Sequence, residues 1–116
     1  MVYTLIGSEG KIKFQGGNMR WDITICRDGY LARKSSGLNA YIKRVCMWPG
    51  LRPFTGPGYD VKYKGFTIAR IFFENKGATV KSLEMCRSFP EISDLDLVEI
   101  ALRVNKLRAA GTAALN

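Results

Sequence analysis

Glycine and proline interrupt the first two thirds of this chain so often that a long helix cannot form there. Turn signals divide residues 1–77 into short segments: Gly16-Gly17, Asp28-Gly29, Pro49-Gly50, Gly56-Pro57-Gly58 and Asn75-Lys76-Gly77. Glycine supplies the positive φ that tight turns need, and proline fixes the first corner of a turn. Regular structure before about residue 78 is therefore confined to short strands.

The segments between these turns are rich in β-branched and aromatic residues, which is typical of strands in a small, mostly antiparallel sheet. The expected strands are Val2–Ile6, Lys11–Phe14, Met19–Cys26, Leu38–Met47, Asp60–Lys64 and Thr67–Phe73. In the third of them, Trp21, Ile23 and Ile25 share one face. Asp22 and Thr24 occupy the other face, so this strand is predicted to be half buried.

The pattern becomes helical after residue 78. Thr79 can cap a short helix that runs to about Arg87. Ser93 can cap a longer helix, which Gly111 would end. The longer helix has an acidic first turn, a basic last turn and an apolar stripe at helical spacing formed by Leu97, Ile100, Ala101, Val104 and Leu107. This stripe can pack either on the sheet of the same chain or on a neighbouring protein.

These elements predict an α+β fold, in which a small, mostly antiparallel β-domain is followed by one short and one longer C-terminal helix. On the longer helix, Glu99 precedes Arg103 by four residues, a spacing that predicts a surface ion pair.

Charge divides the chain into two parts. The 116 residues carry a net charge of +8, with a sequence pI near 9.7. Residues 1–90 hold 15 of the 18 lysines and arginines and 6 of the 10 acids, so residues 91–116 are slightly acidic. We therefore expect a basic, β-rich binding domain at 1–90 and a helical extension at 91–116. A basic surplus favours polyanionic partners, although a basic soluble surface without such a partner has the same composition.

The residue types present exclude most catalytic chemistry. Histidine is absent, which removes the usual general base and the usual metal ligand. Cys26, Cys46 and Cys86 are too far apart for a C-x-x-C motif and are expected to be buried thiols in a reducing compartment. No apolar run is long enough to span a bilayer, and the N-terminus lacks the features of a secretory signal. We expect a non-enzymatic protein without a metal, a cofactor or a membrane partner.

Two basic segments are candidates for binding nucleic acid. In Tyr41–Phe54, Lys43, Arg44 and Arg52 flank a Pro-Gly turn that can hold the cations at a fixed separation for phosphates. Trp48 lies between them and can either stack on a base or belong to the core.

The second segment is Phe72–Ser82. Its candidate residues are Asn75, Lys76, Gly77, Thr79 and Lys81, which would meet at the N-terminus of the short helix, where backbone N–H groups bind anions. The same Asn-Lys-Gly pattern is also an ordinary turn at the end of a strand. A third basic spot, Arg33–Gly37, is expected to be a solvated loop.

Together these segments resemble the C-terminal half of the universal small-subunit ribosomal protein number eight. That family has a segment of the form R-V-S-x-P-G-L-R, which Arg44–Arg52 resembles with one extra residue before the proline. The family's S-T-S-K-G turn, which opens a short helix, is similar to Asn75-Lys76-Gly77. Upstream, Ser8–Phe14 is similar to the family's E-G-F-I segment, and the strand at residues 19–25 is placed like the one that follows it. The resemblance covers about residues 8–87.

The resemblance implies a structural constituent of the small ribosomal subunit that binds the central domain of its ribosomal RNA. Most of the family's N-terminal half is missing, and Phe73-Glu74-Asn75 stands where the family has Ser-Thr-Ser. A family member with these changes implies an organellar ribosome, specifically a mitochondrial one. The alternative is a cytoplasmic or other organellar ribosome. The C-terminal helix would then contact neighbouring ribosomal proteins. The competing hypothesis is a viral or phage protein that binds nucleic acid or forms a capsid.

Overall fold

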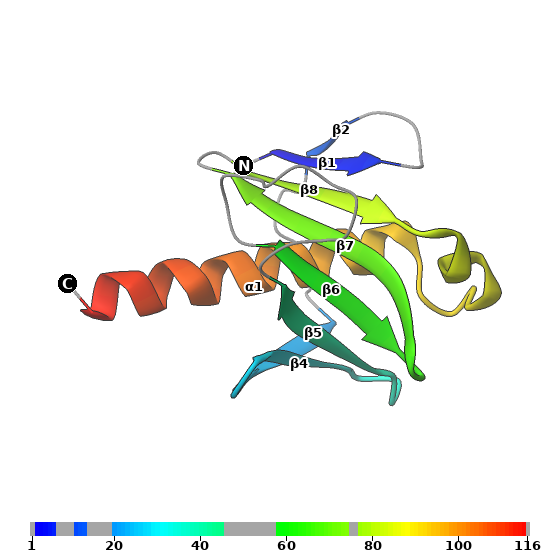
Figure 1. Ribbon diagram of the computed structural model, residues 1–116, viewed down its shortest axis with the longest axis horizontal. Coiled ribbons are helices and arrows are strands. Elements are labelled where there is room, and N and C mark those ends of the chain that lie inside the picture. Colours follow the sequence, from blue (N-terminus) through cyan, green and yellow to red (C-terminus); the bar gives the residue numbers. More distant parts are fainter. Residues whose placement is uncertain (1, 7–10, 14–19, 46–57, 75–76, 116) are drawn as a thin grey trace.

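One curved sheet packs around one long helix in the computed structural model (Figure 1). The structure describes the backbone of residues 2–6, 11–13, 20–45, 58–74 and 77–115. It describes the side chains of residues 20–45, 58–73 and 78–108. The strands are β1 (Val2–Ile6), β2 (Lys11–Lys13), β3 (Trp21–Cys26), β4 (Gly29–Lys34), β5 (Asn39–Val45), β6 (Gly58–Tyr63), β7 (Phe66–Glu74) and β8 (Gly77–Ser82). A 3₁₀ turn, η1 (Glu84–Ser88), precedes the helix α1 (Asp94–Leu115).

The sheet has the order β2-β1-β8-β7-β6-β5-β4-β3. The strands from β3 to β8 form a six-stranded antiparallel meander, β1 pairs with β8 in parallel, and β2 pairs with β1 antiparallel. The prediction of an α+β fold with a mostly antiparallel sheet is confirmed. The prediction of two C-terminal helices is wrong, because α1 is the only α-helix among the described residues and the shorter element is a 3₁₀ turn.

Two strands differ from the sequence-based expectation. Gly77–Ser82 is the strand β8 rather than the start of a helix capped by Thr79. Ala78 and Val80 are buried while Thr79 and Lys81 are half exposed, the period-two alternation of a strand that is buried on one face. Pairing with β7 on one side and β1 on the other outweighs the local helical tendency of this segment.

The other unexpected strand is β4, which contains Arg33 and Lys34 of the predicted solvated loop. Its pairing with β5 depends on Gly29. A Cβ atom at Gly29 would lie 1.9 Å from the carbonyl oxygen of Ile42, so no other residue fits without movement of the backbone. The hairpin between β6 and β7 turns at Lys64-Gly65, where φ is 50° and 84°. These values are those of a type I′ turn, which matches the twist of the paired strands.

The core lies between the sheet and α1. Leu97, Ile100, Ala101 and Val104 of the predicted stripe are completely buried, and so is Val98 on an adjacent face. A helix with apolar residues on most of its sides is buried on most of its sides. In agreement with this, α1 contacts β3 at one edge of the sheet as well as β1, β7 and β8. The stripe therefore packs on the sheet of the same chain (Figure 1).

The first turn of α1 is tied to the start of β3. Ser93 caps the helix: its Oγ accepts the N–H of Asp96 at 3.1 Å, and Oδ2 of Asp96 accepts the N–H of Ser93 at 2.9 Å. Oδ1 of Asp96 accepts the indole N–H of Trp21 at 3.0 Å, and Oε2 of Glu99 accepts the backbone N–H of Trp21 at 2.7 Å. The Nζ of Lys34 lies 3.2 Å from Asp96 Oδ1.

This arrangement corrects three further predictions. Glu99 is only 6% exposed and accepts the backbone N–H of Trp21, so it is not the exposed surface charge that was predicted. Lys34 is part-buried beside Asp96 rather than solvated in a loop. The cap by Ser93 is confirmed, but Gly111 does not end the helix, which continues to Leu115. A glycine inside a helix costs only about 1 kcal/mol relative to alanine, which does not stop a helix on its own.

Exposure differs along β3. Trp21 is completely buried and Ile23 is partly buried, whereas Ile25 on the same face is 67% exposed. The half-buried prediction therefore holds for the first part of this strand only. Cys86 is buried as expected, but Cys26 is partly exposed. Within the described part of the chain, no helix combines the length and the apolar character needed to cross a membrane.

Candidate nucleic-acid interface

A row of charged residues crosses the face of the sheet that α1 does not cover, which we call the outer face. In the strand pairing, Lys43 of β5 lies opposite Asp60 of β6, Asp60 opposite Arg70 of β7, and Arg70 opposite Lys81 of β8. Paired residues of neighbouring strands point to the same face, while Ile42, Val61, Ile71 and Val80 beside them point into the core. Lys43 and Lys81, two residues predicted to bind RNA, therefore share one surface.

The outer face is basic on both sides of this row. Its described cations are Arg33, Lys43, Lys62, Arg70 and Lys81, and its described carboxylates are Asp22 and Asp60. Asp60 Oδ1 lies 3.6 Å from Arg70 Nε, so this carboxylate is already shared with a cation. No described carboxylate lies within ion-pair distance of Lys43, Lys62 or Lys81. The described residues of the outer face therefore carry a net positive charge, which favours binding of a polyanion.

Tyr41 supplies an aromatic ring on the same face. It lies opposite Lys62 of β6 and is half exposed. An aromatic ring beside lysines on a sheet can stack on an unpaired base while the lysines contact phosphates. Neighbouring strands are about 4.8 Å apart, so the backbones of Lys43 and Lys81 are separated by about 14 Å, three strand spacings. One phosphate cannot contact both lysines across this distance. The two lysines are therefore placed to contact different phosphates along a nucleic-acid strand.

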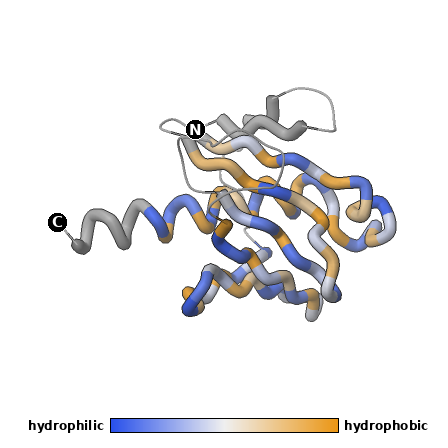
Figure 2. Tube along the Cα trace, in the orientation of Figure 1, coloured by the Kyte–Doolittle hydropathy of each residue, from blue (hydrophilic) through white to orange (hydrophobic). Residues whose placement is uncertain are grey.

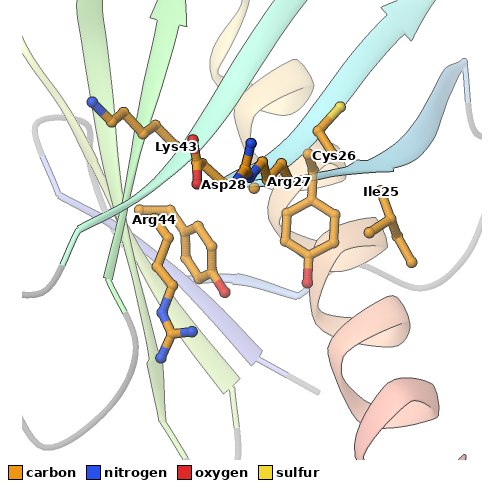
Figure 3. A pocket seen from close by; sticks show the side chains of 9 residues that line it. Ile25, Cys26, Arg27, Asp28, Lys43 and Arg44 are labelled. Atoms are coloured by element: carbon orange, nitrogen blue, oxygen red, sulfur yellow. The ribbon is translucent and has the colours of Figure 1, made fainter.

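Arg44 does not belong to this surface. It follows Lys43 directly in β5, so it points to the opposite face, where it lies opposite Tyr59. Figure 3 shows the side chains of Lys43 and Arg44 pointing in opposite directions. The two adjacent cations that the sequence suggested as one binding pair therefore act on different faces.

An open pocket with a volume of about 580 Å³ lies at this end of the sheet, next to the turn between β3 and β4. Arg44 lines it together with Tyr59 and residues 25–30 of the β3–β4 hairpin, and Lys43 lies at its margin (Figure 3). The backbone N–H of Arg44 donates to the carbonyl of Asp28 at 2.9 Å, which fixes the strand to the turn. Burial raises the pKa of the Tyr30 hydroxyl, and the neighbouring Tyr59 hydroxyl raises it further.

The other predicted residues either lie outside the described residues or have a different role from the one predicted. Arg52, Asn75, Lys76 and Trp48 lie outside the described residues, and so does Cys46. Gly77 begins β8 instead of a helix, so the expected anion site at a helix N-terminus does not form at Gly77–Ser82. Thr79 is on the outer face, opposite Phe72, and does not cap a helix.

Comparisons with protein-family models, with curated proteins and with solved structures give no match. The assignment of a function therefore depends on the sequence and on the geometry of the chain itself. Among the described residues, no group of histidine, cysteine, aspartate or glutamate is arranged to hold a metal ion.

Sequence reasoning missed part of the interface. Lys62 and Arg70 were not selected, because each is a single basic residue in its own strand, and Tyr41 was named only as the first residue of the basic segment Tyr41–Phe54. Alternation along a strand assigns a residue to one of two faces, but only the register between strands brings residues of four strands into one row. Alternation in β5 could have separated Lys43 from Arg44.

Proposed function

We propose that this protein binds RNA through the outer face of its sheet. The observation that carries the proposal is the cross-strand row in which Lys43 and Lys81, with Lys62 beside them, surround the Asp60–Arg70 pair. The surplus of lysines gives affinity for phosphates through counterion release, and Tyr41 offers a stacking surface for an unpaired base. This is a binding function without catalysis.

We further propose that the RNA is small-subunit ribosomal RNA and that the protein is a structural constituent of that subunit in mitochondria. Support for this finer assignment comes from the resemblance of Arg44–Arg52 and Asn75-Lys76-Gly77 to the ribosomal family. A net charge of +8 suits a protein embedded among phosphates. Because the buried stripe of α1 packs on the sheet, contacts with neighbouring ribosomal proteins would use other faces of the helix.

Charge-matched variants test the RNA-binding surface. Lys62→Gln and Lys81→Gln each remove one cation from the outer face, and Arg87→Gln removes one exposed cation from η1 as the control. We expect each outer-face variant to weaken binding to a single-stranded RNA about fivefold and to reduce the slope of log K against log salt by about 0.7. The control variant should leave the slope unchanged. Equal slopes for all three variants and the wild type would rule out the outer face.

Sedimentation tests the ribosomal assignment separately. A native lysate is separated on a gradient, and the protein is followed by mass spectrometry beside small-subunit ribosomal RNA. Comigration with the small subunit through a high-salt wash is the expected result. Recovery only at the top of the gradient, or together with virions, would contradict the ribosomal assignment and favour the viral hypothesis.

A further inference from the structure

The aromatic part of the pocket beside the β3–β4 turn lies on the face of the sheet that carries α1, while the lining also includes Lys43, whose side chain is on the outer face. Arg44 and Tyr59 lie opposite each other in β5 and β6, and Tyr30 lies opposite the buried Ile42. All three side chains therefore point to the α1 face of the sheet. Figure 3 shows the guanidinium of Arg44 pointing away from the ammonium of Lys43.

The floor of this pocket is aromatic. The rings of Tyr30 and Tyr59 are 5.8 Å apart between centroids and inclined by 55°, and Tyr59 in turn packs edge-on against Phe73 at 5.5 Å. Tyr59 is only 5% exposed, so Tyr30 is the ring that a ligand can reach. Ile25, at 67% exposure, adds apolar surface beside it. A flat, uncharged ring of a ligand could stack on Tyr30 and cover this apolar surface, which would exclude water from it.

The rim of the pocket is cationic. Arg44 and Arg27 are exposed and line it, and Asp28 is its only described carboxylate. Lys43 also lines the pocket, and Arg108 of α1 lies with its guanidinium carbon 4.4 Å from the centre of the Phe73 ring. Arg108 and Arg44 both act electrostatically on the Tyr30 hydroxyl. The positive charge is thus placed at the edge of an aromatic floor, which suits a ligand with an anionic group attached to a ring.

We propose that this pocket binds a single nucleotide, with its phosphate against Arg44 and Arg27 and its ring against Tyr30. A volume of about 580 Å³ lies within the usual range of small-molecule sites. Arginine forms paired hydrogen bonds to phosphate, and a tyrosine ring can stack on any base. The site goes beyond the proposed RNA binding, because Arg44 and the tyrosine rings are on the opposite face from the lysine row and the pocket holds one nucleotide rather than a length of strand. The nucleotide is either the phosphorylated end of an RNA strand or a free mononucleotide.

Titration of the full chain with AMP and with adenosine, followed by NMR or calorimetry, tests the phosphate contact. We expect AMP to bind at least about tenfold more tightly than adenosine, because charge-assisted contacts to the phosphate are lost in the nucleoside. Arg44→Gln should reduce this difference, because Arg27 would then be the one arginine left at the phosphate. Tyr30→Leu should weaken both ligands, whereas Tyr30→Phe, which keeps the ring, should retain most of the affinity. Lys62→Gln on the outer face is the charge-matched control and should bind AMP like the wild type.

The site does not exist as proposed if AMP and adenosine bind equally, if neither binds at millimolar concentrations, or if Arg44→Gln and Lys62→Gln behave alike. Thermal melts of each variant separate a lost contact from a lost fold, and Arg44 is exposed, so its substitution should leave the melting temperature unchanged.

Short RNAs with a 5′-phosphate or a 5′-hydroxyl distinguish the two sources of the nucleotide. If the source is a strand end, the phosphorylated RNA binds more tightly than the hydroxyl form and competes with AMP. If the source is a free mononucleotide, AMP binds but the 5′-phosphate adds nothing to the affinity of the RNA. Failure of the outer face would be visible separately, because Lys81→Gln would then leave RNA binding unchanged while AMP still bound.

Discussion

Asp96 joins three parts of the fold, and its removal should destabilise the protein more than any other single change at the surface of α1. Its carboxylate accepts the indole N–H of Trp21 at 3.0 Å and the backbone N–H of Ser93 at 2.9 Å. It also forms an ion pair with Lys34 at 3.2 Å, in which the two side chains are only 8% and 13% exposed. Replacing Asp96 with alanine would leave two N–H donors and one ammonium group without this acceptor.

The expected magnitude follows from the burial of these groups. Removal of one member of a buried ion pair costs about 3–5 kcal/mol, because the remaining charge is left without compensation. A domain of this size has a total stability of about 5–15 kcal/mol, so Asp96→Ala should remove a large part of it. Asp96→Asn keeps the size and one acceptor oxygen and should cost less, about 1–3 kcal/mol.

Urea denaturation followed by tryptophan fluorescence measures both variants. Trp21 is completely buried next to Asp96, so its emission should report the transition. The double variant with Lys34→Met is the internal control: the combined loss should be smaller than the sum of the single losses, since each single change leaves a partner uncompensated. A loss below about 1 kcal/mol for Asp96→Ala would refute this account of the helix N-terminus.

The same carboxylate should make stability depend on pH. Burial by itself would raise the pKa of Asp96, but hydrogen bonds from Ser93, Trp21 and Lys34 together lower it below its ordinary value of 3.8. The stabilisation by Asp96 is therefore fully present above the pKa that its carboxyl group has in the unfolded chain. It is lost as the pH falls through the lower pKa of this group in the folded protein. The difference in free energy of unfolding between wild type and Asp96→Asn should shrink as the pH falls below about 4. A constant difference across this range would contradict the assignment.

Five other substitutions have definite expected outcomes. Gly29→Ala places a Cβ 1.9 Å from the carbonyl oxygen of Ile42 and should destabilise the fold by more than about 1 kcal/mol in urea denaturation; an unchanged midpoint would contradict the close approach. Ser93→Ala removes the helix cap and should cost about 1 kcal/mol, while Ser93→Asp, which keeps a capping oxygen, should cost less in the same assay. Arg52→Ala and Lys76→Ala should each weaken RNA binding by about 1 kcal/mol and reduce its salt dependence, and an unchanged salt slope would exclude both residues from the interface.

Local chemistry in the sequence determined where several elements lie. Glycine and proline restrict the backbone within one or two residues, so most strands and the turn at Asp28-Gly29 could be predicted from their positions. Ser93 followed by the acids of the first helical turn marks the start of α1, because a cap is a contact between residues three apart. Charge counting separated the basic part of the chain from the slightly acidic C-terminal part without any structure.

Long-range pairing decided what the sequence left open. Gly77–Ser82 became a strand because β7 and β1 are available on both of its sides, and nothing within the segment reveals those neighbours. Glu99 and Lys34 look like ordinary surface charges in sequence, yet packing of α1 against β3 buries both beside Trp21.

The candidate sites depend on the same non-local information. Lys43 and Lys81 are far apart in the chain and meet on the outer face only through the register of four strands. Arg44, the immediate neighbour of Lys43, instead joins Tyr30 and Tyr59 in the pocket on the other face. A sequence supplies the charges and the rings, but the pairing of strands decides which of them share a surface, because a shift of one residue in register exchanges the two faces.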